Sequence, residues 1–161
     1  MSGPAVRPRM EGQKLPDFTM EYEDGNEFTP ATLRGAPAVL YFYPKDDTPG
    51  CTTEACGIRD AWASFEGQGL RVYGVSRDDA ASHRRFREKY DLPFPLLTAD
   101  EATLERLGVW KEKNLYGKRF MGIQRETLLV GADGTVLKHY RKVKPAGHAE
   151  QILTDFQAVT A

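Results

Sequence analysis

The sequence predicts an α/β fold in which a central mixed sheet carries helices on both faces. Three observations indicate this class. Apolar, strand-like runs alternate with helical patterns along most of the chain, which is typical of a sheet with parallel strands. Near the C-terminus, two strand-like runs flank the turn signal Asp133-Gly134, so an antiparallel hairpin extends the sheet. With 161 residues, 40% of them hydrophobic, the chain can build one continuous core.

The first elements precede the central sheet. Residues 1–13 contain prolines and glycines without periodicity, so we expect a mobile N-terminal arm, followed by a single domain over residues 14–161. Residues 15–28 are strand-like on either side of the turn signal Asp24-Gly25 and predict an N-terminal β-hairpin. The apolar run 38–43 then predicts a buried strand.

After this strand, helices and strands alternate. Helices are predicted over residues 52–65, 80–89, 100–108 and 145–158, and strands over residues 70–76, 92–97, 123–130 and 136–141. Residues 109–122 are basic and aromatic and contain two glycines, so we expect a loop there.

The residues that carry chemistry lie where the buried strand gives way to the next helix. Pro49 suits the first turn of a helix, and Thr48 before it can cap free N–H groups with its hydroxyl. Gly50 allows the backbone to approach a ligand closely. Cys51 falls in the first turn, where unpaired N–H groups and the helix dipole favour an anion.

A reactive cysteine at this position needs more than the helix. A free thiol has a pKa near ~8.5, and reactive sites lower it to roughly 3.5–7.5. A helix dipole contributes at most ~2 kcal/mol. A guanidinium at ~4 Å contributes up to ~4 kcal/mol at an effective dielectric constant of ~20. We therefore expect an arginine beside Cys51.

Cys51 and Cys56 are the only two cysteines, and their spacing is informative. On an intact helix this offset separates the two Cα atoms by about 8.6 Å, whereas a disulfide needs roughly 4.4–6.8 Å. The pair can form a disulfide only if the helix start unwinds, which suits a thiol that is resolved during a reaction. Two inert buried thiols are the alternative, and half of a zinc site is disfavoured because no histidine lies at ligand spacing.

The pattern Pro44-x-x-x-Thr48-x-x-Cys51 resembles the active site of the peroxiredoxins. The longer run from Phe42 to Cys56 is similar to their Q-type branch, also called bacterioferritin comigratory protein. The resemblance implies a thioredoxin-like sandwich. It also implies an arginine at the head of a late strand, beside the cysteine.

Arg125 is the arginine that matches this position, in the segment 122–125 that resembles the family's. Arg59, two turns along the cysteine helix, is the rival candidate. Glu54 lies near the helix start, where it can complement the dipole or hold Arg125 in place.

The resemblance implies a peroxidase that reduces hydrogen peroxide and alkyl hydroperoxides. Cys51 would be oxidised to a sulfenic acid, which Cys56 would resolve as an intramolecular disulfide, and thioredoxin would reduce the disulfide. Thr48, Arg125 and the N–H groups of Gly50 and Cys51 would bind the peroxide, and Pro44 would shield it from water. Resolution within one chain favours a monomer.

Other function classes receive less support. A net charge of −1 does not indicate the basic surface that nucleic-acid binding requires. The sequence contains no apolar run long enough to span a membrane and no signal-peptide pattern. We expect a cytoplasmic protein, because free thiols suit a reducing compartment. The scattered histidines His83, His139 and His148 and the absence of a Rossmann or phosphate-loop pattern predict no metal and no cofactor.

Two rival functions remain at this stage. A peroxide sensor would use the same thiol pair as a switch without turnover. A thioredoxin-type disulfide reductase is disfavoured because the chain lacks a CxxC motif.

Overall fold

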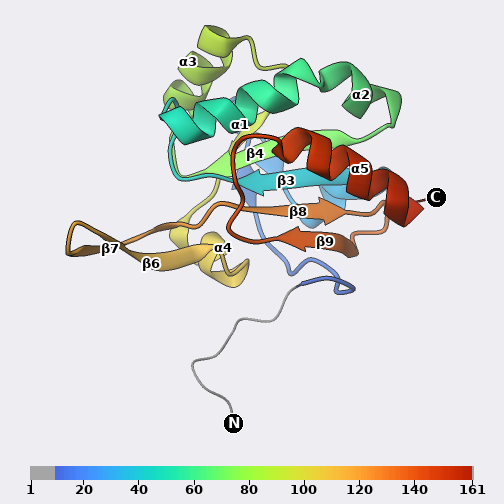
Figure 1. Cartoon of the computed structure of the whole chain (residues 1–161). Helices are drawn as coiled ribbons and strands as arrows, with labels where there is room; N and C mark the ends of the chain where they lie inside the picture. Colours follow the sequence, from blue (N-terminus) through green and yellow to red (C-terminus); the bar gives the residue numbers. More distant parts are fainter. Residues whose placement is uncertain (1–9, 161) are drawn as a thin grey trace.

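The computed structural model describes residues 10–160, which are organised around one large sheet (Figure 1). Its strands are β1 (Met20–Glu21), β2 (Glu27–Phe28), β3 (Ala38–Phe42), β4 (Arg71–Ser76), β5 (Leu96–Thr98), β8 (Glu126–Val130) and β9 (Val136–Tyr140). Within the described residues the order is β2-β1-β5-β4-β3-β8-β9. The β3–β4 and β4–β5 pairs are parallel and the other neighbours are antiparallel. The predicted mixed sheet is confirmed.

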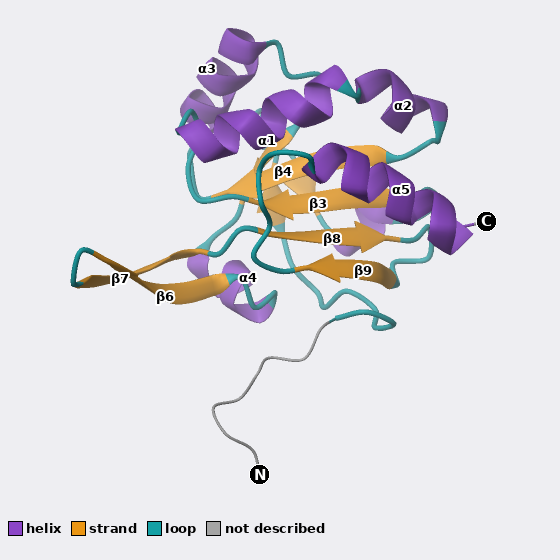
Figure 2. Ribbon diagram, viewed as in Figure 1, coloured by secondary structure: helices purple, strands orange, loops and turns teal. Residues whose placement is uncertain are grey.

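Helices cover both faces of this sheet, unevenly (Figure 2). They are the 3-10 helix η1 (Pro30–Leu33) and the α-helices α1 (Pro49–Asp60), α2 (Trp62–Gly67), α3 (Ala80–Tyr90), α4 (Glu101–Arg106) and α5 (His148–Thr160). In the view of Figure 1, α1, α2, α3 and α5 lie above the sheet and α4 lies below it. The edge hairpin β1–β2 and η1 also contribute side chains to the core on this lower face.

Strand β3 explains why the core has two halves. Every one of its residues is buried, and successive side chains point to opposite faces, as a pleated strand requires. Leu40 and Phe42 join the core on the α4 side, whereas Val39 and Tyr41 join the core beneath α1 and α5. A strand buried on both faces must be apolar throughout, which is why this run was recognisable in the sequence.

The pairing of β3 with β8 determines where the chemistry lies. The two strands are antiparallel, with Phe42 opposite Glu126. The C-terminal end of β3, which leads into α1, therefore lies beside the N-terminal end of β8. Arg125 directly precedes β8, so the topology brings it next to the first turn of α1.

The prediction of a loop over residues 109–122 is wrong. Strands β6 (Trp110–Leu115) and β7 (Lys118–Ile123) form a regular antiparallel hairpin that is separate from the main sheet. Its two-residue turn is Tyr116-Gly117, with φ of 53° and 79°. Positive φ at both positions is typical of a type I′ turn, whose usual sequence signals are Asn-Gly and Asp-Gly. Tyr-Gly lacks that signal, so the hairpin was missed.

Several boundaries also differ from the prediction. The helix expected over 52–65 starts at Pro49 and is divided at Ala61, where φ and ψ are −97° and 10°. The last helix starts at His148, not Pro145. The strand expected over 123–130 is divided between β7 and β8.

The N-terminal arm was expected to extend to residue 13, but the described part of it is attached. The backbone N–H of Met10 donates to His139 Nδ1 at 3.1 Å, and Gly12 and Gln13 exchange backbone hydrogen bonds with Val136. Residues 1–9 of the predicted arm lie outside the described residues. Among the described residues, no helix is long and apolar enough to cross a membrane.

Candidate active site

Cys51 lies in the first turn of α1, at the junction of β3, α1 and β8. Its side chain is only 1% exposed and packs in the core beneath α1 and α5. Arg125 Nη2 donates to Cys51 Sγ at 3.4 Å. A buried sulfur therefore has a guanidinium within hydrogen-bonding distance and sits at the positive end of a helix. Both features favour the thiolate over the thiol.

Glu54, one turn along α1, holds the other side of this guanidinium. Arg125 Nη1 donates to Glu54 Oε1 at 2.8 Å, so the arginine bridges the carboxylate and the sulfur through different nitrogens. Glu54 is buried, and its Oε2 has no hydrogen-bond partner among the described residues. Burial raises the pKa of the Glu54 carboxyl to about 7, although Arg125 opposes the shift.

Gly50 has a role that the sequence did not indicate. A Cβ at this position would lie 3.0 Å from Arg125 Nη2 and 3.4 Å from Pro145 Cγ. The glycine therefore makes room for the guanidinium as it crosses the first turn of α1. We had expected it to make room for a ligand.

Thr48 occupies the N-cap position of α1, but its hydroxyl does not cap the helix, so that expectation is wrong. The hydroxyl donates instead to the carbonyl of Lys45 at 2.8 Å. The Thr48 carbonyl accepts the N–H of Thr52 at 2.8 Å, which is the first bond of the helix. Because its hydrogen is used within the loop, the Thr48 oxygen can still accept a hydrogen bond from a ligand. Pro44 lies exposed in the same loop.

Cys56 and Arg59 lie further along the same helix. Both cysteines are free, Cys56 is half-buried, and α1 is continuous between them. Arg59 donates to Asp60 Oδ1 at 3.0 Å and to the carbonyl of Tyr90 at 2.7 Å, so its guanidinium is directed at α3. Of the two candidate arginines, the structure brings Arg125 to Cys51.

Lys113 is a neighbour of the site that the sequence analysis missed. It lies on β6, within the segment expected to be a loop, and its chain packs over Gly122. Burial and the nearby charge of Arg125 lower the pKa of Lys113, while Cys51 opposes that shift. The hairpin β6–β7 thus brings a second positive charge towards the sulfur. Recognising the hairpin would have placed it there.

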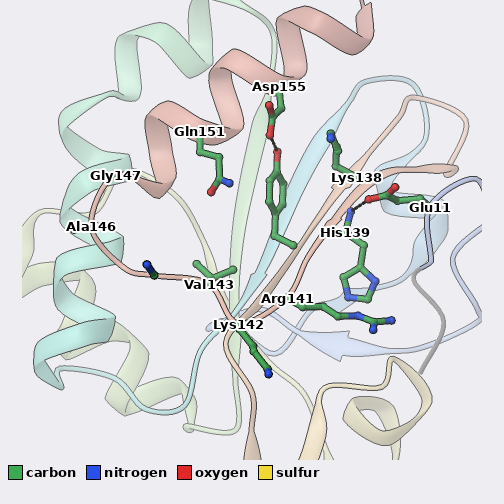
Figure 3. A pocket seen from close by; sticks show the side chains of 12 residues that line it. Glu11, Lys138, His139, Arg141, Lys142, Val143, Ala146, Gly147, Gln151 and Asp155 are labelled. Carbon is green, nitrogen blue, oxygen red and sulfur yellow. Dashed lines mark hydrogen bonds between the residues drawn. The ribbon is translucent and has the colours of Figure 1, made fainter. Parts of the chain in front are cut away.

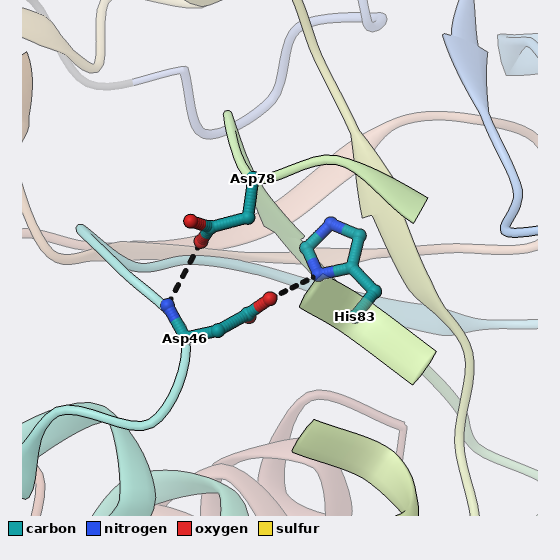
Figure 4. A group of neighbouring side chains, drawn as sticks. All are labelled: Asp46, Asp78 and His83. Carbon is teal, nitrogen blue, oxygen red and sulfur yellow. Dashed lines mark hydrogen bonds and ion pairs between the residues drawn. The ribbon is translucent and has the colours of Figure 1, made fainter. Parts of the chain in front are cut away.

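One group in the described part of the chain could hold a metal. Potential ligand atoms of Asp46, Asp78 and His83 lie within 4.8 Å of one another (Figure 4). The His83 Nδ1 is already bonded to Asp46 Oδ2 at 2.7 Å, and Asp78 Oδ2 accepts the Asp46 N–H at 2.8 Å. These hydrogen bonds use the same lone pairs that a metal would need, so we assign no metal to the group.

A cavity of about 650 Å³ lies between β9, the loop after it and α5 (Figure 3). Its charged lining residues include Lys138, Arg141, Lys142 and Asp155. Its lining includes neither cysteine, so it is distinct from the site around Cys51.

Comparison with known proteins identifies the family. The AhpC/TSA family matches residues 11–139. The chain is 46% identical over 143 residues to peroxiredoxin Bcp of Bacillus subtilis, covering 88% of this chain and 91% of the relative. It is 43% identical over 143 residues to the putative peroxiredoxin bcp of Coxiella burnetii, covering 88% and 95%.

Solved structures agree with this assignment. One match is the bacterioferritin comigratory protein of Xanthomonas campestris, in a trapped intermediate/ligand complex that concerns that protein's alkyl peroxide reduction activity. Its sequence is 40% identical to this chain. Its TM-score is 0.83, and the match covers 89% of this chain and 92% of that one. A Cys-to-Ser mutant of PrxQ from Xylella fastidiosa is 33% identical, with a TM-score of 0.88 and coverage of 96% and 99%. The predicted thioredoxin-like fold is confirmed. The chain belongs to the AhpC/TSA family and, within it, to the Bcp/Q-type peroxiredoxins, which makes it a thiol-dependent peroxidase.

Proposed function

We propose that Cys51 is the peroxidatic cysteine and that its substrates are hydrogen peroxide and alkyl hydroperoxides. The observation that carries this assignment is the 3.4 Å contact between Arg125 Nη2 and Cys51 Sγ at the start of α1. The thiolate attacks the terminal peroxide oxygen, the O–O bond breaks, and the leaving hydroxide or alkoxide takes up a proton. Cys51 is left as a sulfenic acid.

The residues around Cys51 have complementary roles in this step. The Thr48 hydroxyl donates to Lys45, so its oxygen accepts the peroxide O–H and orients the substrate. The Arg125 guanidinium and the N–H groups of Gly50 and Cys51 stabilise charge on the departing oxygen. Pro44, in the same loop, shields the reacting atoms from water.

Cys56 resolves the sulfenic acid in the second step. Its sulfur attacks Cys51 Sγ, an S–S bond forms, and the hydroxyl leaves as water. On an intact helix the two Cα atoms are about 8.6 Å apart, so the first turns of α1 must unwind. A dithiol protein of the thioredoxin class then reduces the disulfide in the cytoplasm. Because one chain holds both cysteines, a monomer suffices.

A coupled assay tests the assignment. Peroxide consumption is followed with thioredoxin, its reductase and NADPH for the wild type, Cys51→Ser and Cys56→Ser. Cys51→Ser should be inactive, and Cys56→Ser should consume one equivalent of peroxide and then stop. Continued turnover by Cys51→Ser would end the assignment, and continued turnover by Cys56→Ser would show that an outside thiol resolves Cys51.

The same assay separates the peroxidase from a sensor. A sensor would consume about one equivalent of peroxide even with the reductase present. Insulin reduction by the dithiol form would instead favour a disulfide reductase.

A further inference from the structure

The loop that joins β3 to α1 is tied to α3 at two successive residues. The Asp47 carboxylate accepts hydrogen bonds from Lys89 Nζ and Tyr90 Oη, each at 2.8 Å, near the end of α3. The Asp46 carboxylate reaches the start of α3, where Oδ2 is bonded to His83 Nδ1. The loop that carries Thr48 is therefore held along the length of one helix.

The contact between Asp46 and α3 is buried, and both carboxylate oxygens of Asp46 have hydrogen-bond partners. Asp46 is 7% exposed and His83 is 0% exposed. Besides the 2.7 Å contact with His83, Oδ2 accepts the Ser82 hydroxyl at 2.8 Å and Oδ1 accepts the Tyr43 hydroxyl at 2.5 Å. The Asp46 N–H donates to Asp78 Oδ2 at 2.8 Å (Figure 4). Three segments of the chain, the end of β3, the start of α3 and the loop after β4, thus converge on one loop residue.

The His83 ring also connects this loop to the sheet. Its Nδ1 lies 2.7 Å from Asp46 Oδ2, and its Nε2 lies 3.1 Å from the carbonyl of Leu97 on β5. A hydrogen must lie between Nδ1 and Oδ2, because two lone pairs would repel each other at that distance. One buried imidazole thus joins the Asp46 loop to β5.

We propose that Asp46 and His83 form a positioning pair for peroxide reduction. The inference rests on the proposed roles of Cys51 and Thr48. Lys45, whose carbonyl holds the Thr48 hydroxyl, directly precedes Asp46. Displacing Asp46 therefore shifts the hydroxyl that orients the peroxide, while Cys51 stays anchored in the core by its own packing.

Two substitutions at one position separate positioning from simple stability. Asp46→Ala removes every side-chain bond of Asp46. Asp46→Asn keeps the shape, and its amide N–H can donate to His83 Nδ1, so the contact with α3 is retained. Arg87→Ala is the matched control, because it breaks another tie of α3, the 2.8 Å bond from Arg87 Nη1 to Glu23 Oε2, that does not involve the loop.

The experiment measures the rate of Cys51 oxidation by hydrogen peroxide at neutral pH, and separately the rate of disulfide formation. Asp46→Ala should slow Cys51 oxidation about ten- to a hundredfold at neutral pH, the loss typical of a buried charged hydrogen bond. Asp46→Asn should react at nearly the wild-type rate, because it retains the contact with His83. Arg87→Ala should match the wild type throughout.

Several outcomes would overturn the positioning role. One is a wild-type oxidation rate for Asp46→Ala. Another is an oxidation rate for Asp46→Asn as low as that of Asp46→Ala. If Asp46→Ala does not fold, the oxidation rate of Asp46→Asn decides alone, and a loss of about tenfold or more there would overturn the role. A wild-type protein without Cys51-dependent oxidation would instead refute the proposed function.

Discussion

Replacing Arg125 by alanine removes the cation nearest the sulfur. At the observed 3.4 Å, Coulomb's law with an effective dielectric constant of ~20 gives an attraction of about 5 kcal/mol. Arg125 is also paired with Glu54, and its side chain is 16% exposed, so roughly half of this is a realistic contribution to the thiolate. That sets an upper limit of about 30- to 150-fold on the loss in reactivity at neutral pH, because a less stabilised thiolate is also the better nucleophile.

The loss for the peroxide reaction should be larger than the loss for alkylation. Alkylation by iodoacetamide reports only the thiolate, whereas peroxide reduction also loses the charge that stabilises the departing oxygen. We therefore expect Arg125→Ala to slow peroxide reduction by about 10²- to 10³-fold or more. Stopped-flow fluorescence follows the oxidation, and circular dichroism checks that the fold is retained.

The neighbouring arginine on α1 provides the control. Arg59→Ala removes a guanidinium that binds Asp60 and the Tyr90 carbonyl, so peroxide reduction should stay near the wild-type rate. Arg125→Lys keeps the charge but cannot bridge Glu54 and Cys51 through a planar fork, so its rate should be intermediate. A wild-type rate for Arg125→Ala would refute the reasoning, and a large loss in Arg59→Ala would move the role to that arginine.

Two further substitutions probe the support of Arg125. The pKa of Glu54 is raised from 4.5 to about 7, so its contribution to stability is full below pH 4.5 and is lost as pH rises to 7. Urea denaturation should show Glu54→Gln gaining about 3 kcal/mol relative to the wild type over that interval, and a pH-independent difference would contradict the assigned shift. Gly50→Ala places a Cβ 3.0 Å from Arg125 Nη2 and should slow peroxide reduction, whereas Gly57→Ala, which meets nothing within 4 Å, should leave that step unchanged. Equal rates for the two glycine variants would show that the guanidinium simply moves aside.

Local signals in the sequence were sufficient for much of the fold. The buried strand 38–43, the helix start around Pro49 and the Asp133-Gly134 turn each depend on residues close in sequence. The mixed sheet follows from their alternation. The hairpin β6–β7 was missed because Tyr116-Gly117 forms its turn without the Asn-Gly or Asp-Gly sequence that usually indicates one.

The geometry of the site was harder to predict from the sequence, because its residues lie far apart in the chain. The need for an arginine followed from the energetics of a thiolate, but the contact between Arg125 and Cys51 exists because β8 pairs with β3. Thr48 was expected to cap α1, yet its hydroxyl donates to the Lys45 carbonyl and accepts no N–H of the helix. A threonine hydroxyl can bond to several nearby backbone groups, and the residue type alone does not select one of them. The pairing of Asp46 with His83 spans 37 positions and left no local pattern to detect.

The most direct test of the whole account is to treat the reduced protein with one equivalent of hydrogen peroxide and map its cysteines by mass spectrometry. We expect the loss of two hydrogens and a peptide linked through Cys51 and Cys56. The Cys56→Ser variant should gain one oxygen on Cys51. An unmodified Cys51, or oxidation that begins at Cys56, would contradict it.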